Sequence, residues 1–297
     1  MRGLETVQTK LPLRLHQPVA GETGGRQQAI QNPAQQGFHV QRIFDFAAMV
    51  KHRERAAGRL GQIAPVLEDL TARLLDRLDD TTIRFERALD FGGRGAVAPA
   101  LAARGMLVDS ADASPRLAAL AGGRPLILPG PDDFGLAPGA YDLVVAPLSL
   151  HWLDDLPGAL IQLRRALKPG GLLLASLPAL GTLHELRLAL LEAEEALTGK
   201  VSPRVSPFPE LRDCAGLLQR AGFSHPVADL EEITFLYANP LALLHELRDA
   251  GETNALAGRS RAIPPRALFA AALAALPQQD GRLAVALRLA MLTGWAS

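Results

Sequence analysis

The residues best suited to chemistry are two aspartates and the glycines beside one of them. Asp90-Phe91-Gly92-Gly93-Arg94-Gly95 follows an apolar run and opens an alanine-rich helical stretch, and Asp112 ends the next apolar run. Glycine lets the backbone approach a ligand closely, and the N-terminus of the next helix offers unpaired N–H groups. A carboxylate roughly 20 residues further on can accept both hydroxyls of a ribose. This spacing predicts an adenosine site; a glycine turn beside a solvated aspartate is the structural alternative.

A second group of polar residues follows the predicted fourth strand, where open α/β sheets place groups that face a substrate. The chain there reads Ser149-Leu150-His151-Trp152. A histidine at this point can act as a general base, and Trp152 can form the wall of a pocket. Alternatively, His151 and Trp152 only pack the end of the strand against the next helix.

Arg204 lies in a proline-stiffened loop, between Ser202-Pro203 and Ser206-Pro207-Phe208. A guanidinium group is a planar fork that can clamp a carboxylate or a phosphate. The setting predicts a role in substrate binding, with a solvated surface arginine as the alternative. Glu252 and Asn254 follow Gly251, which can end a helix, so capping is their first expected role and substrate contact the second.

Composition and charge exclude several classes of protein. The chain has 297 residues, 48% of them apolar, and no formal net charge. It can bury a substantial core, and it has no net field to attract nucleic acid or an anionic bilayer. No apolar run approaches the roughly 18 residues that span a membrane, so we predict no stable membrane insertion. The single cysteine, Cys214, excludes an internal disulfide and a multi-cysteine metal site, and we predict no metal.

The domain is expected over residues 40–297. Residues 1–39 are rich in Gln, Gly and Pro, which predicts a disordered tail or an over-extended gene start, with a weak targeting peptide as a third interpretation. A helical cap is expected over 40–80. We expect a cytoplasmic protein in a bacterium, or a mitochondrial matrix protein in a eukaryote.

Strands then alternate with helices, which is typical of a parallel sheet covered on both faces. The expected strands span 88–91, 106–109, 125–128, 141–146 and 172–176, with a helix over 157–167. The second half predicts helices over 183–197, 210–221, 240–250 and 265–276, and a strand over 227–237 broken around Glu231-Glu232. Periodicity alone leaves 283–295 open between helix and strand.

The order of these motifs resembles class I S-adenosylmethionine-dependent methyltransferases. The resemblance rests on Asp90-Phe91-Gly92, Asp112, Tyr141-Asp142-Leu143-Val144 and Leu167-Lys168-Pro169-Gly170-Gly171. A closer resemblance is to the methyltransferase-like complex I assembly factor of mitochondria and its alphaproteobacterial relatives; the biotin-pathway malonyl-carrier methyltransferases are more distant. It rests on Ser149 to Trp152 with Asp155-Leu156-Pro157, Thr182 to Arg187, Ser202 to Phe208, Gly251 to Asn254 and Leu292 to Trp295.

The resemblance implies an α/β, Rossmann-like fold with a seven-stranded, mostly parallel sheet. N-terminal helices come before a core over 86–237, and a helical insertion over 238–280 comes before an antiparallel last strand at about 283–295. The implied cofactor is S-adenosyl-L-methionine. We predict that its binding set is Asp90, Gly92, Gly93, Gly95, Asp112, Asp132, Asp133 and Ser149, and that the catalytic set is His151, Trp152 and Arg204.

Two departures from the family pattern carry predictions of their own. Related proteins usually read D-x-G-x-G-x-G, and residue-by-residue alignment places Asp90, Gly92, Arg94 and Ala96 at the four fixed positions. In the alternative alignment one residue is deleted, and Gly93 and Gly95 serve as the glycines. In the first alignment, the arginine side chain is expected to crowd the methionine part of the cofactor. Relatives also carry an acidic residue after the third strand, where this chain has Gly130 with Asp132 and Asp133 just beyond.

Three functions follow as expectations. The first is an S-adenosylmethionine-dependent methyltransferase that acts on a protein or a small acidic substrate, with a respiratory complex subunit as the expected partner. The second is a protein-arginine hydroxylase of a complex I subunit that uses the same cofactor pocket. The third is a non-catalytic assembly chaperone with a degenerate cofactor loop.

Overall fold

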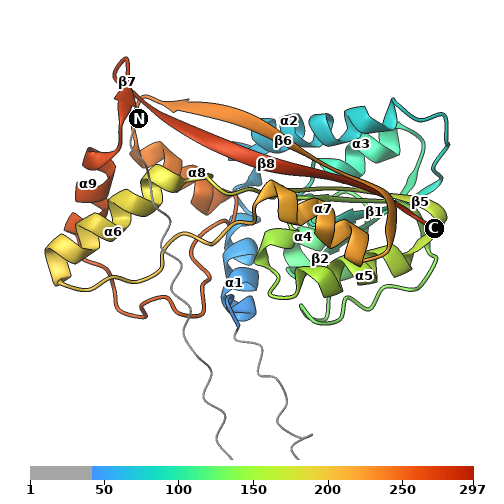
Figure 1. The fold of residues 1–297 in the computed structure, drawn as a ribbon, viewed down its shortest axis with the longest axis horizontal. Coiled ribbons are helices and arrows are strands. Elements are labelled where there is room, and N and C mark those ends of the chain that lie inside the picture. The colour runs from blue at the N-terminus through green and yellow to red at the C-terminus, as the bar shows by residue number, and fades with distance from the viewer. Residues whose placement is uncertain (1–41) are drawn as a thin grey trace, which may run out of the picture. The chain divides into compact units, whose positions relative to one another are not determined.

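The computed structural model describes residues 42–297, and the tail predicted over 1–39 lies outside the described residues. The described part is a twisted sheet with helices on both faces (Figure 1). No described helix has both the length and the apolar content needed to cross a membrane.

Seven strands of the sheet run in the order β3-β2-β1-β4-β5-β8-β6. Neighbours from β3 to β5 are parallel, whereas β8 is antiparallel to both β5 and β6. This arrangement confirms the predicted fold class. The strand bounds are β1 Arg87–Phe91, β2 Leu107–Asp112, β3 Arg124–Ile127, β4 Tyr141–Pro147, β5 Leu167–Pro178, β6 Phe223–Tyr237 and β8 Arg282–Ala296.

One strand was not expected: β7, Gln278–Gln279, pairs with the beginning of β8. The turn between them contains Asp280 and Gly281, both with positive φ. Aspartate and glycine tolerate this left-handed backbone, which suits a two-residue hairpin loop. The short strand therefore forms a hairpin with the beginning of β8 and adds no further layer to the fold.

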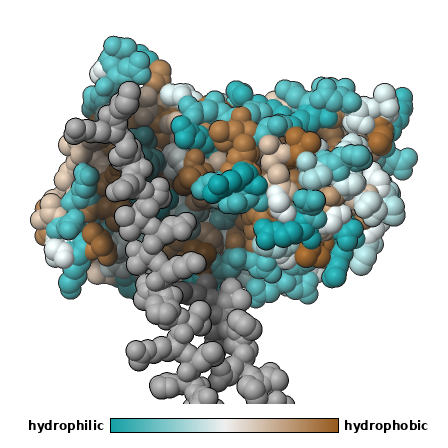
Figure 2. Space-filling model, in the orientation of Figure 1, coloured by the Kyte–Doolittle hydropathy of each residue, from teal (hydrophilic) through white to brown (hydrophobic). Residues whose placement is uncertain are grey.

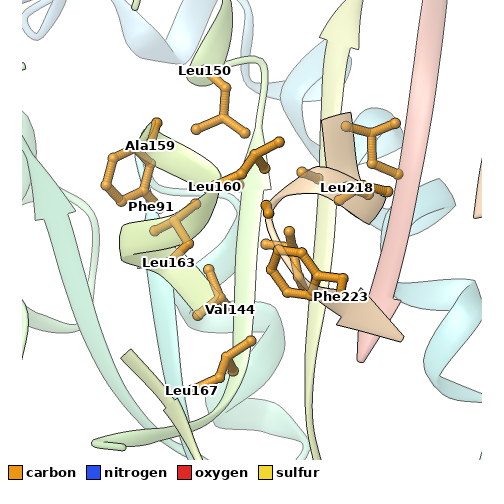
Figure 3. Close-up of a cluster of buried hydrophobic side chains, with 14 of the residues drawn as sticks. Phe91, Val144, Leu150, Ala159, Leu160, Leu163, Leu167, Leu218 and Phe223 are labelled. Atoms are coloured by element: carbon orange, nitrogen blue, oxygen red, sulfur yellow. The ribbon is translucent and has the colours of Figure 1, made fainter. Parts of the chain in front are cut away.

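Helices cover the two faces of the sheet with separate apolar clusters. One cluster packs α5 and α7 against β1, β4 and β5, and the other packs α2 and α3 against the opposite face of the same strands. Figure 3 shows part of the first cluster, with Val144 between Leu163 and Leu167. The helix bounds are α1 Phe46–Ala56, α2 Ala64–Leu75, α3 Val97–Ala103, α4 Pro115–Leu120, α5 Leu156–Ala166, α6 His184–Thr198, α7 Leu211–Arg220, α8 Leu241–Asp249 and α9 Arg266–Ala275.

The long β6–β8 ribbon differs from the sequence expectation in one place. Glu231 and Glu232 do not interrupt β6, because they pair in register with Leu289 and Arg288 of β8. The irregularity lies earlier, between Ser224 and Val227. β6 is an edge strand with one partly solvated face, where carboxylates stay hydrated or ion-paired. The expected break was therefore wrong.

A third cluster gathers α6, α8 and α9 against the outer half of the β6–β8 ribbon. In Figure 1 these helices lie together at the end of the ribbon opposite α5 and α7. Figure 2 shows hydrophilic groups over the β7 end and the rims of this face, with apolar groups between them. A mostly apolar cavity opens between α8, α2 and the β6–β8 ribbon.

Candidate active site

A narrow crevice lies at the carboxyl ends of β1 and β2 and beside the end of β4. This edge is where strand order reverses, and open α/β sheets place ligands there. Its volume is about 30 Å³. The lining combines polar groups on β1, β2 and the β4 end with apolar side chains, and consists of Phe46, Met49, Arg53, Phe91, Gly92, Ala111, Asp112, Ala113, Leu128, Gly130, Phe134, Ser149, Trp152 and Leu153.

The glycine loop has the shape that close ligand approach requires. Gly92 has φ 77°, and a Cβ added to it would lie 2.7 Å from Cβ of Ser149. A Cβ on Gly93 would lie 2.3 Å from Oδ1 of Asp90. Gly95 also has positive φ. Both Gly92 and Gly93 therefore lack room for a side chain, and glycine keeps the backbone of the loop exposed to the crevice.

Asp90 holds the glycine loop in place from the buried side of the loop. It is fully buried and accepts a hydrogen bond of 2.8 Å from the backbone N–H of Gly93. Burial raises the pKa of Asp90 to about 7, and the neighbouring carboxylate of Asp112 acts in the same direction. Asp90 does not line the crevice, so the structure gives it a role in holding the loop.

Asp112 lies at the end of β2 and faces the crevice, as a ribose-binding carboxylate must. It is paired with Arg53 of α1: Nη2 of Arg53 lies 2.6 Å from Oδ2 of Asp112, and both side chains are buried. Nη2 also donates to the carbonyl oxygen of Gly92 at 3.3 Å. The Asp112 carboxylate raises the pKa of Arg53 despite burial, which alone would lower it. Arg53 thus occupies the position beside Asp112 that the prediction assigned to ribose hydroxyls.

The side chains that line the crevice are suited to bind S-adenosylmethionine, but the volume of the crevice in this conformation is too small to hold it. Apolar side chains such as Phe91 and Phe134 can flank an adenine ring. The hydroxyl of Ser149 is buried in the crevice and has no hydrogen-bond partner among residues 42–297, so it can still bind a ligand. However, about 30 Å³ holds roughly two water molecules. If the cofactor binds in this crevice, the side chain of Arg53 would have to withdraw from Asp112.

Asp132 and Asp133 are not brought into the crevice. The side chain of Asp132 is 77% exposed and lies 3.4 Å from Arg42, while Asp133 accepts from the backbone N–H of Gly135. Gly130 and Phe134 line the crevice instead. The loop after β3 turns its carboxylates toward solvent and its aromatic ring inward, so neither aspartate touches the adenine side in this conformation.

Arg94 does not reach into the crevice either. Its side chain is buried, and it donates to the carbonyl oxygens of Ala250 and Leu148 and to the carboxylate of Glu252. Arg94 itself has φ 54°, a left-handed conformation. The expected crowding of the methionine part is therefore absent from the crevice, because the side chain points toward a second cavity.

This second cavity, called the pocket below, has a volume of about 190 Å³. It lies between the β6–β8 ribbon, α2, α8 and the 204–208 loop, and most of its lining is apolar. Trp152 lines both the pocket and the crevice. The indole is held by an edge-on contact with Phe44, with ring centroids 5.4 Å apart. The two cavities therefore meet at this side chain, where a substrate could approach a bound cofactor.

Glu252 is the polar centre of the pocket. One carboxylate oxygen lies 2.8 Å from Nε2 of His151 and 2.8 Å from Nε1 of Trp152, and the other lies 2.8 Å from Nη1 of Arg94. Burial alone would raise the pKa of Glu252, but His151, Arg94 and Arg53 outweigh it and lower that pKa to about 2. The carboxylate is therefore ionised at neutral pH and orients both predicted groups, His151 and Trp152.

His151 has one ring nitrogen free for chemistry. Its Nε2 lies against Glu252, whereas Nδ1 is buried with no hydrogen-bond partner among the described residues. If Nε2 carries the proton that Glu252 accepts, Nδ1 presents a lone pair. A carboxylate that fixes the tautomer of a histidine in this way is the usual arrangement for a general base.

Arg204 lines the pocket, but its guanidinium group is already paired with an internal carboxylate. Nε and Nη2 both donate to the carboxylate of Glu194, which also accepts from the backbone and hydroxyl groups of Ser202. The guanidinium lies 6.0 Å from the ring centroid of Phe269. The pair fixes the 202–208 loop to α6, so the predicted clamp holds an internal carboxylate in this conformation.

Sequence reasoning missed Arg53 and gave Glu252 mainly a capping role. The buried residues of α1 are Met49, Arg53 and Ala56, a helical spacing that places the arginine on the inner face of the helix. A cationic side chain on the buried face of a helix indicates that an oppositely charged group lies in the interior beside it. Glu252 carried no such signal, because its three partners come from distant parts of the chain.

Comparisons with known proteins agree with this geometry. Residues 59–225 match the family described as Methyltransferase domain. The mitochondrial arginine-hydroxylase NDUFAF5 of Homo sapiens is 33% identical over 245 residues, covering 77% of this chain and 69% of the relative. The malonyl-[acyl-carrier protein] O-methyltransferase of Gallionella capsiferriformans is 30% identical over 259 residues, covering 81% of this chain and 87% of the relative.

Solved structures show the same fold at low identity. The YcgJ protein of Bacillus subtilis aligns with a TM-score of 0.50 and 12% identity, covering 75% of this chain and 97% of that one. A methyltransferase-fold protein of Bacillus halodurans aligns with a TM-score of 0.50 and 13% identity, covering 76% and 99%. The family match over more than half of the chain settles the membership: this protein belongs to the class I S-adenosylmethionine-dependent methyltransferase superfamily.

Proposed function

We propose that this protein is an S-adenosylmethionine-dependent methyltransferase that binds its cofactor in the crevice and its substrate in the pocket. The observation that carries the proposal is the wall shared by the two cavities, Trp152, with the free Nδ1 of His151 buried beside it. Asp112, Gly92 and Ser149 would hold the adenosine part of the cofactor. When bound, S-adenosylmethionine supplies an electrophilic methyl group.

The residues around Trp152 would then serve alignment and proton transfer. Methyl transfer is an in-line displacement, so correct placement of the acceptor contributes most of the acceleration. Glu252 keeps the His151 ring in one orientation, and Nδ1 can take a proton from the acceptor atom. The buried indole excludes water from the place where the two ligands meet. Arg204 would act by fixing the 202–208 loop through Glu194.

The pocket supports a mostly apolar substrate surface, presented by a protein or a small molecule. The two arginines that line it, Arg94 and Arg204, are both paired with internal carboxylates. An acidic substrate would therefore have to displace Glu252 or Glu194, and the structure gives no support for the acidic class. We propose a role in respiratory complex assembly, in the cytoplasm or the mitochondrial matrix, because NDUFAF5 relatives are named as mitochondrial proteins.

A second candidate reaction is hydroxylation of a protein arginine. It is favoured by several relatives of this chain that are named arginine-hydroxylases, among them those of Homo sapiens and Danio rerio. The crevice would bind the same cofactor in this case. The two reactions differ in product and in reactants. Methyl transfer adds a methyl group to the acceptor and releases S-adenosylhomocysteine, whereas hydroxylation adds one oxygen atom to an arginine and needs an external oxidant such as O2 together with a two-electron donor.

Titration calorimetry with S-adenosylhomocysteine tests the proposed cofactor site. We expect the wild type to bind, and Asp112→Asn to weaken binding by about tenfold or more because the ribose loses an ionised acceptor. Asp132→Asn is the matched control, since that carboxylate is exposed outside the crevice. Mass spectrometry of a candidate protein substrate then separates methylation from hydroxylation. Absence of heat at millimolar ligand would leave a non-catalytic chaperone as the better account.

A further inference from the structure

Glu246 of α8 lines the pocket and plays no part in the proton transfer described above. Its carboxylate accepts a hydrogen bond of 2.5 Å from the hydroxyl of Tyr237, at the end of β6. Burial and the neighbouring carboxylate both raise the pKa of Tyr237, so the phenol stays protonated and keeps donating across the ordinary pH range. The hydrogen bond holds Glu246 in one place on the pocket wall.

One charged side chain of the pocket has no ion-pair partner among the described residues, whereas the others are paired. Arg94 is paired with Glu252 and Arg204 with Glu194. Glu246 has no Lys, Arg or His nitrogen within 4.0 Å among residues 42–297 that would form a salt bridge with it. The pocket therefore holds one carboxylate whose charge is answered by a neutral hydroxyl alone.

An apolar cavity makes such a carboxylate selective. The walls near Glu246 include Phe235, Leu243 and Leu247, and the lining of the pocket as a whole is mostly apolar. A carboxylate that loses water on ligand binding is penalised unless a cation replaces that water. A neutral or anionic group placed beside Glu246 would leave the penalty uncompensated, whereas a cation would remove it. Aromatic side chains in the lining add a favourable surface for a cation.

We propose that Glu246 is the specificity-determining residue of the pocket and binds the positively charged end of the substrate, a guanidinium or ammonium group on an apolar stem. Tyr237 is a positioning residue that orients the carboxylate. The stem would lie along the apolar wall, and the reacting atom would lie toward His151 and Trp152. This inference rests on the proposed function only in assigning the pocket to the substrate.

Direct binding of small probes tests this inference without any turnover. The probes are N-acetyl-arginine amide, N-acetyl-lysine amide, N-acetyl-citrulline amide and N-acetyl-glutamate amide, with affinities measured by ligand-observed NMR on the full-length protein. Citrulline matches arginine in shape and lacks its charge. We expect the wild type to prefer arginine to citrulline by about tenfold, since an ionised pair of hydrogen bonds is lost in the neutral probe. Comparison of the arginine and lysine probes distinguishes the two cations.

Substitutions of Glu246 and Tyr237 test whether these two residues select the charge of the ligand. Glu246→Gln should bring the arginine and citrulline affinities to within about twofold, and Glu246→Lys should reverse the preference toward the glutamate probe, as expected from opposite-charge pairing. Tyr237→Phe should reduce the arginine preference by less than Glu246→Gln does. Glu195→Gln is the matched control, because Glu195 lies exposed on α6 and outside the pocket.

Two outcomes would overturn the inference. Equal affinity of the wild type for the arginine and citrulline probes would show that the pocket does not select charge. An unchanged arginine preference in a folded Glu246→Gln variant, verified by its thermal melting, would place the selecting group elsewhere. Failure of the cofactor site is measured separately, by the S-adenosylhomocysteine titration, and leaves the probe result readable.

Discussion

At the scale of single residues, the site contains two carboxyl groups whose surroundings shift their pKa values in opposite directions. Glu252 is ionised because His151 and two arginines outweigh its burial. For Asp90, burial and the nearby carboxylate of Asp112 prevail, and its pKa is raised from 3.8 to about 7. One of these carboxyl groups thus stabilises a loop, and the other holds the side chains of His151 and Trp152.

Asp90 gives the fold a predictable dependence on pH. A carboxyl group whose folded pKa is raised binds its proton more tightly in the folded state, so stability is lost as pH rises from the unfolded pKa to the folded one. For Asp90 this window runs from 3.8 to about 7. Asp90→Asn should remove that loss and retain the bond to Gly93. We expect the difference in free energy of unfolding between the wild type and Asp90→Asn to change, in favour of the variant, across this window.

Urea unfolding at a series of pH values measures this difference. Asp109→Asn is a useful comparison, because salt bridges with Arg124 and Arg87 lower the pKa of Asp109 in spite of burial. Its contribution should disappear as pH falls below the ordinary range of aspartate, the opposite direction. A pH-independent difference between the wild type and Asp90→Asn would contradict the raised pKa.

At the scale of elements, we propose that α1 controls access to the crevice. Asp45 caps its N-terminus by accepting from the backbone N–H of Ala48, and the helix then carries Arg53 across the crevice to Asp112. The bond between Arg53 and Asp112 must break before a ribose can bind. Arg53→Met should therefore tighten S-adenosylhomocysteine binding, by about tenfold if one charge-assisted contact is relieved.

The matched control for this prediction is Arg55→Met on the same helix. Arg55 is exposed and has no salt bridge among the described residues, so the substitution should leave cofactor affinity unchanged. Calorimetric titration of the two variants measures the difference. Weaker binding in Arg53→Met than in the wild type would mean that Arg53 supports the cofactor rather than competing with it.

Sequence patterns located the elements well and their contacts poorly. Strands β1 to β5 were expected close to their places, because buried parallel strands read as apolar runs between glycine-rich turns. The 283–295 run became β8, since it is central between β5 and β6 and is stabilised by pairing on both sides. Periodicity could not show this, because the partners lie far away in the sequence. The same holds for Arg53 with Asp112 and for Glu252 with His151.

At the scale of the whole molecule, the crevice and the pocket lie on either side of Trp152, and we propose that they bind the cofactor and the substrate, respectively. The crevice lies in the parallel half of the sheet, and the pocket lies between the antiparallel ribbon, α2 and α8. Glu252, in the loop after α8, joins the two halves through Arg94 of the glycine loop and His151 of the β4 end. Arg94, which departs from the family glycine pattern, thus links the loop after β1 to the pocket and does not enter the crevice.

The crystal structure of the complex with S-adenosylhomocysteine tests the central claim most directly. We expect the ribose hydroxyls on the carboxylate of Asp112, the guanidinium of Arg53 withdrawn from it, and the sulfur next to Trp152. A nucleoside bound elsewhere, or Arg53 still paired with Asp112 beside a bound ligand, would contradict the account.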